Sequence, residues 1–267
     1  MTDAINLVNQ VIDEENRDKP AATRRQMIAG STALLGGMGL LGASPAMAQL
    51  SGSKYSGPNT PQNILNVAVT AEALATIVNT VGVERVALDG TTRRNVAAAA
   101  DQEKEHFEFL LAAGAKPAAT RIWVPNEVFE NATNLLTTLA VGDQIFINAY
   151  LLGVTVFARP GNASPRLSRY SAEIMGVEAV HRALALQSLG RLGNDRVYMR
   201  FAGREETPNL PTTGTNGFYK ITEAVTQLQG AGFGFGAEGS KPGQFYEYDE
   251  VSQRTAKLAE VHTRKPV

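Results

Sequence analysis

The chain lacks cysteine and is poor in other residues that often carry chemistry. Its 267 residues include no cysteine, one tryptophan and three histidines. Without cysteine it forms no disulfide and no thiolate metal site, so a tightly held metal ion needs carboxylate, imidazole or other oxygen ligands. Positive and negative charges are nearly balanced, since the formal net charge is -1 at pH 7. This balance gives no electrostatic reason to expect a nucleic-acid partner.

The first fifty residues have the pattern of a targeting signal. Arg24 and Arg25 precede a charge-free stretch at 28–43, rich in Gly, Ala and Leu, which is followed by the small-x-small site 46–48. This pattern resembles a twin-arginine signal peptide more than a general secretory one. We expect residues 1–48 to be cleaved off, with the twin-arginine export machinery as a partner and a periplasmic or extracellular mature protein. A retained membrane anchor is disfavoured, because the stretch is shorter than the roughly 20 residues that span a bilayer.

Breaker residues divide the mature chain into three parts. We expect a linker at 49–60, a helical bundle at 61–193 and a C-terminal extension at 194–267. Stretches bounded by Pro and Gly, with no strand pattern between them, predict four main helices. They cover residues 61–81, 91–113, 127–157 with a break near Gly142, and 168–189. The expected fold class is all-α, a four-helix bundle with a loop-rich extension.

The extension differs in character from the bundle. Its pattern predicts a short helix at 219–229, a glycine-rich turn and a polar tail. Phe233 and Phe235 in the turn are expected either to cover the bundle or to meet another subunit of a homo-oligomer. Residues 234–239 match a dinucleotide fingerprint formally, but they lack the strand-turn-helix context that gives this motif meaning. No dinucleotide cofactor is therefore expected.

Two Glu-x-x-His motifs are the main chemical signal of the sequence. Glu103 and His106 lie in the second predicted helix, and Glu178 and His181 lie in the fourth. At a spacing of three, the carboxylate and the imidazole share one helical face and can both reach a metal ion in a bundle core. The third histidine, His262, lies in the polar tail without a ligand spacing around it. The two motifs together predict a metal site between two helices.

Glu72 adds a third carboxylate from the first predicted helix. It is the only charged residue between Lys54 and Glu84, so we expect its side chain to point into the core. A buried carboxylate is costly to ionise when it has no partner. Three converging carboxylates would also raise one another's pKa, a conflict that cations at the centre would resolve.

These residues resemble the ligand set of the ferritin-like superfamily, and in particular of its exported branch that includes desiccation-related proteins. The resemblance covers roughly residues 63–192. It implies a ferritin-like four-helix bundle that binds two iron or manganese ions. The ligands are one Glu from the first helix, Glu-x-x-His from the second, one Glu from the third and Glu-x-x-His from the fourth. Five positions of that set are filled here, by Glu72, Glu103, His106, Glu178 and His181.

The third helix departs from the family pattern. The family's third-helix Glu, placed before a Gly-Val pair, corresponds to Tyr150 ahead of Gly153 and Val154. Asp143 lies two turns earlier, roughly 10 Å along the axis, which we expect to be too far to replace that Glu. Tyr150 is thus the sixth candidate residue of the site, as a ligand or as a hydrogen-bond partner. The implied metal centre is either dinuclear or degenerate, with one ion, two weakly held ions or none.

Two functional hypotheses follow from this set. In the first, the protein is a metal-dependent oxidoreductase of ferroxidase or catalase type that reacts with dioxygen or peroxide and protects the envelope during oxidative or drying stress. In the second, it is a non-catalytic envelope protein that has lost the metal site and keeps the bundle for stability or for binding partners. A folded structure that spread the five ligands beyond coordination distance would exclude the first hypothesis.

Overall fold

The computed structural model describes residues 59–162, 164–194, 199–200, 215–255 and 257–258. The expected signal peptide with its cleavage site, most of the expected linker, and His262 lie outside these described residues. The predictions made for those segments therefore remain predictions.

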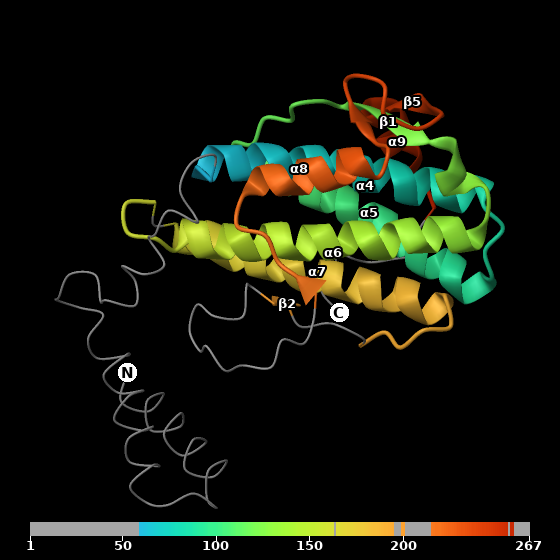
Figure 1. Ribbon diagram of the computed structural model, residues 1–267, viewed down its shortest axis with the longest axis horizontal. Helices are drawn as coiled ribbons and strands as arrows, with labels where there is room; N and C mark the ends of the chain where they lie inside the picture. The colour runs from blue at the N-terminus through green and yellow to red at the C-terminus, as the bar shows by residue number, and fades with distance from the viewer. Residues whose placement is uncertain (1–58, 163, 195–198, 201–214, 256, 259–267) are drawn as a thin grey trace, which may run out of the picture. The chain divides into compact units, whose positions relative to one another are not determined.

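Four long helices form a bundle (Figure 1): α4 (Pro61–Arg85), α5 (Gly90–Ala112), α6 (Ala132–Phe157) and α7 (Pro165–Ser188). The most extensive contacts join α4 to α5 and α6 to α7, and the two pairs meet through α4 with α6 and α5 with α7. Each helix faces the others with a buried apolar side, which supplies most of the driving force for packing. The expected all-α bundle with a C-terminal extension is confirmed.

Capping side chains determine where these helices begin. The N-cap side chain of each accepts a hydrogen bond from a backbone N–H of the first turn, and the four N-caps are Thr60, Asp89, Asn131 and Ser164. Thr60 caps α4 with Pro61 at the first helical position, where the missing N–H of proline costs no hydrogen bond. Gly114, just after the end of α5, has a φ of 93°, a conformation that glycine adopts without a steric penalty.

The third helix differs from its prediction in two ways. α6 begins at Ala132 rather than at 127, because Asn131 caps it and the short 3-10 helix η3 (Asn126–Phe129) precedes it. The predicted break near Gly142 is wrong, since α6 is continuous through that residue. One glycine inside a helix costs about 1 kcal/mol. Burial of Leu139 and Phe146 on either side of Gly142 outweighs that cost.

A small antiparallel sheet was not foreseen. β1 (Arg121–Pro125), in the connection between α5 and α6, pairs with β4 (Gly234–Phe235) on one side and with β5 (Gly243–Glu247) on the other. Ile122 and Val124 of β1 are fully buried. The prediction of no strand was wrong here because β1 is short and both partners come much later in the chain, so nothing local reveals the pairing.

The extension packs on the bundle. The expected short helix is α8 (Ile221–Gly230), which contacts α4 and α6 and runs beside them in Figure 1. A further helix, α9 (Tyr248–Thr255), contacts α4 and α5 where only a polar tail was expected. Phe233 is buried in the core, so this aromatic covers the bundle. The two-residue strands β2 (Met199–Arg200) and β3 (Thr215–Asn216) pair in parallel.

Among the described residues, α4 and α6 are long and apolar enough to cross a membrane by length and composition. In α4, 89% of the most apolar window is buried inside the molecule, and in α6 the share is 67%. Their position in the centre of the bundle accounts for this composition, because the core helices of soluble proteins have the same property.

Candidate metal centre

The five ligands predicted from the two motifs and from Glu72 lie together inside the bundle. Glu72 comes from α4, Glu103 and His106 come from α5, and Glu178 and His181 come from α7. All three glutamates are 0% exposed, and both histidines are also buried. The spread that would have excluded a metal site is therefore absent from this part of the structure.

The ligand atoms form two overlapping groups. One consists of Glu72, Glu103, His106 and Glu178, and the other of Glu103, Asp143, Glu178 and His181. Within each group, one ligand atom per residue lies within 4.8 Å of all the others. Hereafter the first group is the first half of the centre and the second group is the second half. Glu103 and Glu178 belong to both halves, the position of carboxylates that bridge two ions.

The expectation that Asp143 lies too far away to join the site was wrong. Its carboxyl group is buried and joins the second half of the centre. Asp143 does lie two helical turns before Tyr150. The centre extends along the bundle axis, however, so Tyr150 contacts its first half and Asp143 belongs to its second half. Asp143 is also the only charged residue of α6, the same signal that identified Glu72 in α4.

The two helix pairs contribute the same kinds of residue in the same order. The pair of α4 and α5 supplies a lone carboxylate followed by Glu-x-x-His, and the pair of α6 and α7 does the same. Asp143 thus corresponds to Glu72. The third helix, which was expected to lack a ligand carboxylate, supplies one in Asp143, whose side chain is one methylene shorter than that of Glu.

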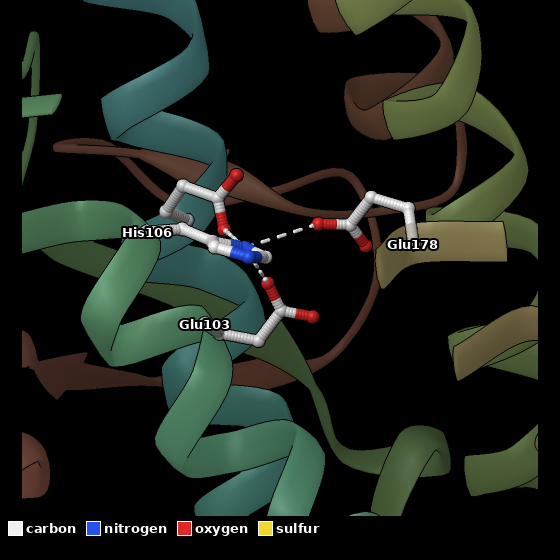
Figure 2. A group of neighbouring side chains, drawn as sticks. Glu103, His106 and Glu178 are labelled. Atoms are coloured by element: carbon white, nitrogen blue, oxygen red, sulfur yellow. Dashed lines mark hydrogen bonds and ion pairs between the residues drawn. The ribbon is translucent and has the colours of Figure 1, made fainter. Parts of the chain in front are cut away.

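His106 is the focus of the first half. Its Nδ1 lies 3.2 Å from Glu103 Oε2, 3.3 Å from Glu178 Oε1 and 3.4 Å from Glu72 Oε2. Figure 2 shows Glu103 and Glu178 directed toward this imidazole from two different helices. One nitrogen carries at most one proton, so it cannot donate to three carboxylates at once.

His181 has a comparable position in the second half. Its Nδ1 lies 3.0 Å from Glu103 Oε1 and 3.7 Å from Glu178 Oε2. On the other side of the ring, Nε2 lies 2.6 Å from Oε1 of Gln102. A proton on Nε2 that is donated to Gln102 leaves the Nδ1 lone pair toward the carboxylates, the orientation that a metal ligand needs. Gln102 was missed, since its position next to Glu103 gives no signal in the sequence.

Several carboxylate oxygens of the centre are buried without a hydrogen-bond partner. They are Glu72 Oε2, Asp143 Oδ2, and both Oε1 and Oε2 of Glu178. Native proteins rarely leave buried oxygens in this state, because each costs free energy unless a donor or a cation satisfies it. The donor set consists only of carboxylates and imidazoles, which suits iron and manganese. These oxygens fit a centre completed by cations.

The pKa values of Glu72 and Asp143 are changed by burial and by the nearby carboxylates of the centre. Burial, and next the charge of Glu103, raises the pKa of Glu72 well above its ordinary value. Burial, and next the charge of Glu178, raises the pKa of Asp143 in the same way. Burial would also raise the pKa of Glu103, but His181 and His106 outweigh it and lower that pKa.

The pKa values of the two imidazoles are raised as well, but by charge rather than by burial. Burial disfavours the charged form of His106 and His181, yet the neighbouring carboxylates outweigh burial and raise both pKa values well above the ordinary one. Protons therefore compensate the negative charge of the centre when no cation does.

Tyr150, the sixth candidate, lies against the first half. It is buried, and its hydroxyl donates a hydrogen bond to Glu72 Oε1. Burial and the charge of Glu72 raise the pKa of Tyr150 well above its ordinary value, so the phenol keeps its proton. Of the two roles expected for Tyr150, ligand or hydrogen-bond partner, the structure shows the hydrogen bond.

Comparison with known proteins gives one match. The family model described as a ferritin-like domain matches residues 61–191. No curated protein and no solved structure matches the chain. The matched segment runs from the first residue of α4 to just beyond α7 and includes every carboxylate and imidazole of the centre.

Proposed function

We propose that this protein, whose residues 61–191 match the model of a ferritin-like domain, binds two iron or manganese ions between its four bundle helices. The observation that carries the proposal is the pair of overlapping ligand groups that share Glu103 and Glu178. Four ionised carboxylates match the charge of two divalent cations and leave both imidazoles neutral. The centre then no longer depends on protons to balance its charge.

Each ion would have its own terminal ligands. Glu72 and His106 would hold the ion of the first half, and Asp143 and His181 that of the second, with Glu103 and Glu178 between them. Bound iron or manganese supplies redox chemistry toward dioxygen or peroxide, which makes a ferroxidase or catalase type of activity our proposal for the enzyme.

The protein's own side chains prepare this site. Complete burial of Glu72, Glu103 and Glu178 excludes bulk water and strengthens their hold on a cation. Tyr150 keeps a proton on the hydrogen bond to Glu72, which fixes the direction of that carboxylate. Gln102 fixes the orientation of the His181 ring through Nε2.

We further propose that the domain works outside the cytoplasmic membrane in oxidative or drying stress. The support is the twin-arginine pattern around Arg24 and Arg25 and the resemblance to the exported, desiccation-related branch. Twin-arginine export carries folded proteins, so a buried centre of this kind can be loaded before export.

The test is the metal content of the full chain, purified from its native compartment without chelators and measured by mass spectrometry. We expect about two iron or manganese ions per chain and near-complete loss in the double variant Glu103→Ala, His181→Ala. Glu108→Ala, an exposed position on the same helix as Glu103, is the matched control and should keep its metal. A folded wild-type protein that contains no metal, even after anaerobic loading, would contradict the proposal.

The alternative of a non-catalytic envelope protein depended on the missing carboxylate of the third helix. Asp143 supplies a carboxylate from that helix, so the number of ligands no longer favours the loss of the site.

A further inference from the structure

A cavity of about 200 Å³ lies between the bundle and the C-terminal extension. Its walls come from α4, η3 and α6 on the bundle side, and from α8 and the turn after it on the extension side. The lining is mainly apolar and includes Leu74, Val78, Leu139, Phe146, Leu228 and Phe233. An apolar cavity of about 150 Å³ is large enough to bind benzene. This cavity is therefore large enough for one aromatic ring.

The inner end of the cavity reaches the second half of the centre. Asn79, Leu139 and Asp143 line it, and the same three residues line a smaller cavity of about 20 Å³ inside the bundle. His181 lines that smaller cavity as well. Neither cavity is lined by a residue that belongs to the first half alone. The larger cavity thus leads toward one half of the centre.

Asn79 supplies an unused acceptor at this inner end. Its side chain is 2% exposed, and its Nδ2 donates to the carbonyl oxygen of Ala75 at 3.0 Å. Its Oδ1 has no hydrogen-bond partner. A buried amide oxygen without a donor is unfavourable, and a ligand that brings a donor into the cavity removes this cost.

A charged pair also lines the cavity. Glu127 of η3 and Lys241 of the extension form an ion pair at 2.5 Å, with side chains that are 51% and 43% exposed. The cavity therefore combines an exposed ion pair, an apolar lining and two buried oxygens without a hydrogen-bond partner, Asn79 Oδ1 and Asp143 Oδ2.

We propose that this cavity binds a phenol: one aromatic ring whose hydroxyl donates to Oδ1 of Asn79. The apolar lining holds the ring, and the buried acceptor selects the hydroxyl. The binding of the phenol does not depend on the proposed function. Only its position beside a metal ion of the second half rests on that function.

Gly142 allows the cavity to be filled by substitution. It lines the cavity from α6, and a Cβ atom built on it would meet no heavy atom within 4 Å. Gly142→Leu therefore places a side chain in open space and removes a glycine from a helix interior. Gly176→Leu is the matched control, because Gly176 lies within α7, has equally free space at Cβ, is exposed and does not line the cavity.

The experiment measures the dissociation constants of phenol and toluene by isothermal titration calorimetry. The full chain is used as purified and again after metal removal, with its helicity checked by circular dichroism. We expect phenol to bind the wild type and Gly176→Leu alike, and to bind Gly142→Leu at least about tenfold more weakly. In Asn79→Ala, the preference for phenol over toluene should fall by about tenfold, the contribution of one hydrogen bond.

Three results would overturn the proposal: no binding of phenol to the wild type, equal binding to the two leucine variants, or an unchanged preference in Asn79→Ala. The metal content is measured on the same samples. Phenol binding in a protein that takes up no metal would support the cavity and contradict the proposed function, so the two can fail separately.

Discussion

The two halves of the centre have the same ligand types but different surroundings. In the first half, Tyr150 donates to Glu72, and His106 faces three carboxylates. In the second half, Asp143 accepts no hydrogen bond from a tyrosine among the described residues and lines two cavities. The comparison teaches that one ligand pattern, used twice, can have different neighbours: a tyrosine hydroxyl beside the first half, and the lining of a cavity beside the second.

The largest effect should come from a carboxylate that both halves share. Glu178→Ala removes a ligand from each group, so we expect the metal content to fall from about two ions per chain to nearly none. Glu173→Ala, at an exposed position on the same helix, should retain the wild-type content. The metal content of both variants is measured by mass spectrometry. A Glu178→Ala variant that kept one ion would show that the halves do not share Glu178.

A smaller effect should follow when one half alone is damaged. Asp143→Asn should abolish binding in the second half only, and Glu72→Gln in the first half only, so each variant is expected to bind about one ion. Titration of the metal-free chain with Mn²⁺ by calorimetry gives the stoichiometry. If Asp143→Asn still bound two ions with wild-type affinity, the second half would not include Asp143.

The pH should change the stability of the metal-free fold and the metal affinity through both halves in the same direction. The raised pKa values of His106 and His181 stabilise the metal-free fold below pH 6.5, the ordinary histidine value, and this stabilisation is lost as the pH rises through the raised values. The raised pKa values of Glu72 and Asp143 act in the same direction. Metal affinity should instead rise with pH, by about tenfold per unit for each proton displaced.

Urea denaturation across this pH range, with and without Mn²⁺, provides the measurement for that prediction. The midpoint should fall with rising pH in the metal-free protein and should fall less, or rise, with Mn²⁺ present. The same pH dependence in both forms would mean that metal and protons do not compete for this centre.

The smallest effects should come from the residues that orient the ligands. Tyr150→Phe should weaken the first half, and Gln102→Ala the second, each by about tenfold in Mn²⁺ affinity. Tyr170→Phe, on α7 and away from the centre, is the control for loss of a tyrosine hydroxyl. If both variants weakened the same half, the division of the centre at Glu103 and Glu178 would be incorrect.

Much of the bundle and most of the centre could be predicted because their signals are local. A Glu-x-x-His spacing and a lone carboxylate such as Glu72 are visible within a few residues. Asp143 has that same signal, but its rejection relied on a single expected level along α6, and only the packed structure shows that the centre spans two levels. Gln102 and Asn79 could not be found, since their roles depend on residues from other helices.

The pairing of β1 with β4 and β5 also has a consequence for the order in which the molecule forms. The bundle helices depend on contacts between neighbours in sequence and can fold early, whereas these strands join segments far apart in the chain. During synthesis the extension emerges last. We therefore expect the nascent bundle to assemble before α8 packs against α4 and α6, so that ions can enter the centre before the extension is in place.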